Sequence, residues 1–109
     1  DRPTTADISL EDVPAAFTAG TMDMGELQNT SGKSLMDLTG CTLDQVLYFV
    51  SKGRPVLAKT ASGPVCIVGY DEFNTHLLKP GQAEWEYYGI QDSTKLFEDS
   101  GNMFISYVE

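Results

Sequence analysis

The clearest hydrophobic pattern in the chain lies between residues 43 and 50, where apolar side chains recur at helical spacing. They occupy the first, fourth, fifth and eighth positions, which form a single stripe along one side of a helix. Thr42 is the expected N-cap, and Gln45 follows it at the spacing of a capping box. Gly53 can adopt the left-handed conformation that ends a helix, and Pro55 prevents the helix from resuming. The stripe comprises Leu43, Val46, Leu47 and Val50.

The segment that follows predicts three strands joined by short turns. Residues 55–60 form the first strand, and residues with turn chemistry occupy 61–64. Residues 65–68 are apolar on both alternating faces, which is typical of a central strand that is covered on both sides. A third strand is expected at residues 75–79. Because the connections are short, we expect these strands to pair as an antiparallel meander.

The N-terminal part of the chain carries weaker patterns. Residues 1–8 are mainly polar and lack periodicity, so they are expected to be disordered or to form a linker. Ser9 is expected to cap a short helix that ends at Gly20. A second short helix near residues 23–28 and an extended piece near residues 34–38 are expected to follow.

The C-terminal part predicts one more helix and a last strand. Asp92 is the expected N-cap of a helix that runs to about Ser100, and residues 103–108 are rich in strand-forming types. Residues 9–109 are therefore expected to form one α+β domain. In it a small antiparallel sheet, made of the three-strand meander and the C-terminal strand, packs against helices on one side. A single core is expected from Val46, Leu47, Val50, Val56, Val65, Ile67, Val68, Leu96, Phe97 and Ile105.

Composition and charge restrict the partners that this chain can take. Its 109 residues are 41% hydrophobic and 21% charged, which is typical of a single globular domain. The formal net charge of −9 makes the domain acidic and argues against nucleic acid or an anionic membrane surface, because both would repel it. The sequence contains no apolar run long enough to cross a bilayer.

Two features of the sequence concern its origin and its thiols. The chain begins at Asp1 without a methionine or a signal peptide, so it is expected to be a mature or excised piece of a longer protein. Cys41 and Cys66 are too few for a disulfide scaffold. One bridge between them is possible, but two reduced thiols that pack as small hydrophobic groups are the better expectation.

Three short motifs appear in the order found in a known peptidase family. Gly53-Arg54-Pro55-Val56 follows the first predicted helix, Gly69-Tyr70-Asp71 ends the apolar strand, and Pro80 ends the next strand. Over residues 41–109 this order resembles the C-terminal half of papain-like cysteine peptidases. It is most similar to the bacteriocin-processing peptidases and their relatives among bacterial cell-surface proteins. The resemblance implies a papain-like half domain.

The positions that carry catalysis in that family are occupied differently in this chain. A cysteine peptidase requires a cysteine nucleophile, a histidine base and an acid that orients the base. The base should open the strand that ends at Gly69, but Ser62-Gly63-Pro64 stands there. The acid should precede Pro80, but that residue is Lys79. Because neither cysteine has the family's Cys-Gly-x-Thr setting, we assign no catalytic residue.

The remaining candidates for function are aromatic residues and one histidine. Trp85, Tyr87 and Tyr88, together with Phe73, could form a flat surface that binds a peptide or a sugar. Alternatively, these rings cover the edge of the sheet and complete the core. His76 could be a base or a metal ligand, but a surface or packing role is the more common one for a single histidine on a strand. No metal and no cofactor are expected, because the chain lacks a histidine/cysteine cluster, a calcium loop and nucleotide-binding motifs.

Two functions remain open on this evidence. The first is a non-catalytic, peptidase-like domain that acts as a binding or structural module of a larger, exported bacterial protein, located outside the cell or on its surface. Its expected partners are the other domains of that protein and a peptide or cell-wall glycan. The alternative is a fragment of a cysteine peptidase whose nucleophile lies outside this chain. A Cys-Gly-x-Thr helix upstream of Asp1 would favour the alternative.

Overall fold

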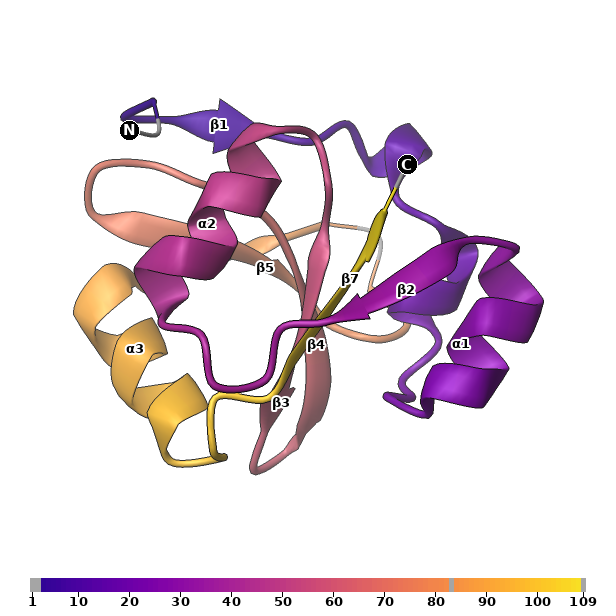
Figure 1. The fold of residues 1–109 in the computed structure, drawn as a ribbon. Helices are drawn as coiled ribbons and strands as arrows, with labels where there is room; N and C mark the ends of the chain where they lie inside the picture. The colour runs from indigo at the N-terminus through magenta and orange to yellow at the C-terminus, as the bar shows by residue number, and fades with distance from the viewer. Residues whose placement is uncertain (1–2, 83, 109) are drawn as a thin grey trace.

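The computed structural model describes residues 3–82 and 84–108, which form an α+β fold around one antiparallel sheet (Figure 1). The strand order is β2-β7-β3-β4-β5-β6, and β1 pairs with β4 beside this path. The strands are β1 (Ala6–Asp7), β2 (Ser34–Asp37), β3 (Val56–Thr60), β4 (Gly63–Tyr70), β5 (Asn74–Leu78), β6 (Glu86–Gly89) and β7 (Phe104–Val108). The helices are α1 (Met24–Ser31), α2 (Leu43–Ser51) and α3 (Ile90–Glu98), and two 3-10 turns, η1 (Leu10–Asp12) and η2 (Ala15–Thr18), precede them. The predicted α+β class is confirmed, with a larger sheet than the sequence predicts.

Helix α2 begins and ends as the sequence predicts. The Thr42 hydroxyl accepts a hydrogen bond from the Gln45 N–H at 3.3 Å, and the Gln45 side chain accepts one from the Thr42 N–H at 2.9 Å. This reciprocal pair satisfies two of the amide groups that a helix start leaves free. Gly53 adopts a φ of +84° just beyond the helix, a value that favours glycine. All four residues of the predicted apolar stripe are buried.

The predicted meander of three strands is confirmed. Strand β4 lies between β3 and β5 and pairs antiparallel with both. The C-terminal strand β7 inserts between β3 and β2, with Leu57 opposite Ile105 and Leu35 opposite Tyr107. The first and last thirds of the chain are therefore joined through β7.

The core has two parts, one on each face of the sheet. Helices α2 and α3 cover one face, whereas α1 and the two 3-10 turns cover the other, so the prediction of helices on one side and a single core is wrong (Figure 1). The alternation of side chains along β4 explains the division, because consecutive residues of a strand point to opposite faces. Ile67 lies in the first part, while Val68 and Ile105 lie in the second. Phe17 and Leu27, both fully buried, close the second face.

Two predicted helix starts differ from the structure. In place of one helix from Ser9, the chain forms two 3-10 turns separated by Pro14, which lacks the N–H needed to continue the first turn. Helix α3 starts at Ile90, immediately after β6, and the Ile90 N–H, which has no partner within the helix, donates to the Phe73 carbonyl at 2.8 Å. Asp92 thus lies inside the first turn, where its charge suits the positive end of the helix dipole.

The N-terminal segment also differs from its predicted form as a disordered piece or linker. Within the described residues from 3 onward, Ala6 and Asp7 pair with Tyr70 and Gly69 of β4. The Ile8 N–H donates to the Val68 carbonyl at 2.8 Å, and the Ile8 side chain is buried. This segment is therefore part of the packed domain.

Candidate functional site

A hollow of about 380 Å³ lies at the end of the sheet where β4 starts and β5 ends. We call it the β4–β5 hollow. Apolar side chains from β4, β5 and α3 line it, and hydroxyl and ammonium groups stand among them. The lining residues are Thr60, Ser62, Gly63, Pro64, Val65, Leu77, Lys79, Pro80, Tyr88 and Leu96.

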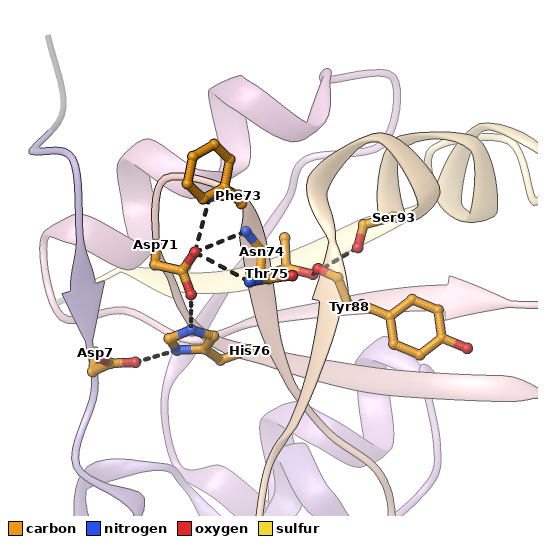
Figure 2. A network of polar contacts seen from close by, with 8 residues as sticks. All are labelled: Asp7, Asp71, Phe73, Asn74, Thr75, His76, Tyr88 and Ser93. Atoms are coloured by element: carbon orange, nitrogen blue, oxygen red, sulfur yellow. Dashed lines mark hydrogen bonds and ion pairs between the residues drawn. The ribbon is translucent and has the colours of Figure 1, made fainter.

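Strand pairing explains why residues distant in sequence meet in this hollow. Cys66 lies opposite Leu78 in the antiparallel ladder, so the start of β4 faces the residue that follows β5. Helix α3 closes the side, held by a buried hydrogen bond of 2.6 Å between the hydroxyls of Thr75 and Ser93 (Figure 2). Thr75 also donates to the Tyr88 carbonyl of β6 at 3.3 Å. One threonine thus links β5, β6 and α3 around the site.

The hollow contains the positions at which the resemblance to papain-like peptidases places a base and an acid. By that resemblance the base would stand at Gly63 and Pro64 and the acid at Lys79, and the structure shows that all three residues line the hollow. Among the described residues that line the hollow, none is histidine, cysteine, aspartate or glutamate. Lys79 pairs with Glu86 at 3.4 Å on the surface. The hollow can therefore offer apolar contact and hydrogen bonds, but its walls provide no thiolate and no carboxylate or imidazole base.

The two cysteines lie elsewhere, and both are free thiols. Cys66 is buried on the second face of the sheet, against Leu57 and Val68 among others. Burial raises the pKa of its thiol far above the ordinary value, so the side chain stays protonated and is a poor nucleophile. Cys41 is partly buried beside the first part of the core, just before α2.

A second polar site surrounds His76, which is 3% exposed on β5 (Figure 2). Its Nδ1 atom lies 2.5 Å from the carboxylate of Asp7 on β1, and its Nε2 atom lies 2.9 Å from that of Asp71 in the β4–β5 turn. A neutral imidazole can donate from one nitrogen only, so hydrogen bonds to both carboxylates require the protonated ring. The contact with His76, followed by the amide of Phe73, lowers the pKa of Asp71 to about 2.

Ring stacking and close packing hold the His76 imidazole in place. Its ring lies parallel to that of Tyr87, with centroids 4.4 Å apart, and to that of Trp85, at 5.6 Å. Gly69 lies opposite His76 in the ladder, and a Cβ atom there would overlap the Asp7 carboxylate. The glycine of the Gly69-Tyr70-Asp71 motif is thus required where β1 meets the sheet.

The His76 network does not form a metal site. The two carboxylates face opposite nitrogens of one ring, so they do not converge on a common point. Across the described part of the chain, no group of three or more histidine, cysteine, aspartate or glutamate side chains is arranged to hold a metal ion. In the same residues, no helix has the length and apolar character needed to cross a membrane.

The four predicted binding residues lie in three different places. Trp85 and Tyr87 stack on His76 at the second face of the sheet. Tyr88 points to the opposite face and lines the β4–β5 hollow, as strand alternation requires. Phe73 is 73% exposed in the β4–β5 turn. The structure therefore does not bring the four rings onto one surface.

The partners of His76 were not predicted from the sequence. Asp71 precedes it by five residues, and the turn residues between them give a local sign that the two could meet. Asp7 lies 69 residues away in a segment without periodicity, and no pattern in the sequence connects it to His76. His76 also lies on an inner strand of the sheet, because β5 stands between β4 and β6.

Comparison with solved structures finds a protein of similar fold. No protein-family profile matches the sequence, and no curated protein matches it. The structure is similar to the crystal structure of a protein described as a putative C39-like peptidase from Bacillus anthracis, with a TM-score of 0.69 and 17% sequence identity. The match covers 79% of this chain and 56% of the other, so this chain spans little more than half of that protein's length. At this identity the similarity establishes the fold alone, which this chain shares with the C39-like protein.

Proposed function

We propose that this chain is a non-catalytic, papain-like domain that binds peptide segments in the β4–β5 hollow. The supporting observation is the composition of that hollow. By the resemblance to papain-like peptidases, the base and the acid would stand in this hollow. The residues at those positions here are Gly63, Pro64 and Lys79. We further propose that the domain belongs to a larger, exported bacterial protein and works outside the cell or on its surface.

The chemistry of cysteine peptidases argues against catalysis at this site. Such an enzyme needs a thiolate and a base within hydrogen-bond reach of each other. Gly63 and Pro64 carry no titratable side chain, and the ammonium group of Lys79 would oppose an imidazolium. The single histidine of the chain is engaged by two carboxylates at the His76 network.

The dimensions and lining of the hollow suit a peptide side chain. Its volume of about 380 Å³ lies within the range of small-ligand pockets, roughly 300–1,000 Å³. Val65, Leu77 and Leu96 provide apolar contact for a side chain, while Ser62 and Tyr88 bring hydroxyl groups that can bind peptide N–H and C=O groups. The net charge of −9 favours neutral or basic peptides over acidic ones.

The alternative function is a peptidase fragment completed by a nucleophile from outside this chain. The partial coverage of the Bacillus anthracis protein favours it, because 44% of that chain has no counterpart here. The absence of a base and an acid from the described lining of the hollow weighs against it, since a supplied cysteine would still lack both.

Titration of the ¹⁵N-labelled domain with neutral, doubly capped tripeptides tests the proposal. Tripeptides with a central leucine or phenylalanine should shift the amide signals of Val65, Leu77 and Leu96 at concentrations up to about 1 mM. A central glycine should produce little change. Shifts located elsewhere, or a response to N-acetylglucosamine oligosaccharides and not to peptides, would contradict peptide binding in the hollow.

Two substitutions on α3 provide the matched control. Leu96→Glu places a charge in the hollow and should abolish the peptide-induced shifts. Lys95→Glu alters the charge of the neighbouring residue, which is exposed and pairs with Asp99. This variant should show the same peptide-induced shifts as the parent chain. Equal peptide binding by both variants would exclude the hollow as the site.

A further inference from the structure

The N-terminal segment, residues 3–8, lies along the sheet where β3 ends its pairing with β4. Strand β3 pairs with β4 as far as Ile67, and β1 then takes the same side of β4 at Gly69 and Tyr70. The ladder between β4 and β5 is irregular between Ile67 and Gly69, at the point of this exchange. The Tyr70 hydroxyl donates to the Pro3 carbonyl at 2.7 Å. We call residues 3–8 the N-terminal strap.

One side-chain contact ties the strap to the inner strand β5. The Asp7 carboxylate reaches over Gly69 and meets Nδ1 of His76 at 2.5 Å. His76 is 3% exposed, so this contact forms beside a ring that is shielded from water. Hydrogen bonds between charged groups are stronger than neutral ones, particularly in such surroundings.

The carboxylates of Asp7 and Asp71, which both contact His76, differ in how many other hydrogen bonds fix them in place. Asp71 accepts hydrogen bonds from the Phe73 N–H and the Asn74 N–H, each at 2.9 Å, and from the Asn74 side chain at 3.3 Å. Its position is therefore fixed by its own turn. Asp7 extends from a strand of two residues and is 46% exposed. If the ring loses one proton, one carboxylate faces a nitrogen lone pair, and Asp7 is the one that can move away.

We propose that His76 is a pH-dependent latch that holds the N-terminal strap on the sheet when doubly protonated and releases it when neutral. The titratable groups that face the ring are Asp7 from β1, Asp71 from the β4–β5 turn and the phenol of Tyr87 from β6. On strand β4, the residue paired with His76 is Gly69, which has no titratable side chain. Release of the strap withdraws the buried Ile8 side chain and uncovers the backbone edge of β4. The latch does not depend on the β4–β5 hollow.

NMR on the intact chain tests the latch directly, since His76 is the single histidine. Histidine side chains in general change charge between about pH 5 and pH 8. At a pH where both ring nitrogens show the chemical shifts of protonated imidazolium, the Ile8 amide should be protected from exchange. At a higher pH, where the ring signals are those of a neutral imidazole, the hydrogen-exchange protection factor of the Ile8 amide should be lower by about tenfold or more, in line with the loss of a charged hydrogen bond. Protection of the Val46 and Leu47 amides in α2 should stay constant.

Three variants separate the latch from a general effect of pH. Asp7→Asn and His76→Gln should each make the Ile8 protection factor independent of pH across this range. Glu11→Gln removes the same charge from the exposed turn η1 and should keep the dependence. If His76→Gln does not fold, Asp7→Asn alone decides the outcome. Constant Ile8 protection through the imidazole titration, or an unchanged dependence in Asp7→Asn, would overturn the proposal.

Discussion

The imidazole of His76 lies 2.5 Å from the carboxylate of Asp7, although 69 residues separate them in the sequence. This contact joins the first strand of the chain to an inner strand of the sheet. The carboxylate of Asp71 lies 2.9 Å from the other ring nitrogen of His76, Nε2. The stability of the N-terminal segment is therefore linked to the ionisation of these three side chains.

Acid should weaken the fold partly through Asp71. Its pKa is lowered from 3.8 to about 2 in the folded state. The ionised carboxylate therefore stabilises the fold at any pH above the pKa of the unfolded state, and this stabilisation is lost as the pH falls from about 4 towards 2. Asp71→Asn should be less stable than the parent chain at about pH 5, and this difference should shrink as the pH approaches 2. Urea unfolding at several pH values measures it. Asp12→Asn, a charge-matched change in η1, should show no such convergence, and a constant difference for Asp71→Asn would contradict the assignment.

Gly69→Ala should displace the N-terminal strap. The added Cβ atom would overlap the Asp7 carboxylate and lie 2.8 Å from the Ala6 carbonyl oxygen, so β1 must shift. We expect a loss of about 1–3 kcal/mol in the free energy of unfolding, which is typical of overpacking, together with lower protection of the Ile8 amide. Gly25→Ala in α1 is the control, since its nearest neighbour is 3.4 Å away and alanine favours a helix. If Gly69→Ala leaves the free energy of unfolding unchanged, the strap is not closely packed.

Truncation of Leu47 tests the central helix. Its side chain is fully buried between α2 and the sheet, so Leu47→Ala should reduce the free energy of unfolding by roughly 2–5 kcal/mol. Tyr48→Ala, at an exposed position of the same helix, should cost less. Denaturant unfolding of both variants provides the comparison. A loss under about 0.5 kcal/mol for Leu47→Ala would mean that the buried face of α2 is assigned wrongly.

Both thiols should be reduced, and Cys66 should resist alkylation in the folded protein. Its burial keeps the thiol protonated, and alkylating reagents react with the thiolate. Mass spectrometry should find little labelling of Cys66 until denaturant is added, whereas Cys41 is partly accessible. Rapid labelling of Cys66 under native conditions would indicate an activated thiol and would support the peptidase alternative.

Local sequence patterns were sufficient to predict the central unit of the fold. Helix α2 has a helical apolar stripe, a capping box and a glycine stop within a few residues of one another. The β3-β4-β5 meander follows from short connections between apolar segments. Both depend on interactions between residues that are close in sequence, which pattern analysis can detect.

The second face of the sheet and the His76 network could not be predicted in the same way. Phe17 and Leu27 lie in short segments near Pro14 and Gly25, so no long periodic stretch marks them as core residues. Strand β1 has two residues and pairs across most of the chain with Gly69 and Tyr70. The resemblance to papain-like peptidases did indicate the positions of Gly63 and Lys79, and the structure brings these positions together in one hollow.

An assay of peptide hydrolysis decides whether this chain is a catalyst. The purified chain is incubated with a panel of fluorogenic peptides and, separately, with an activity-based thiol probe, beside a Cys41→Ala/Cys66→Ala double variant. Because no base lies among the described residues of the hollow and the Cys66 thiol stays protonated, we expect equal background rates for both proteins and no probe labelling of Cys66 in the native chain. Hydrolysis by the parent chain that disappears in the double variant would contradict the account.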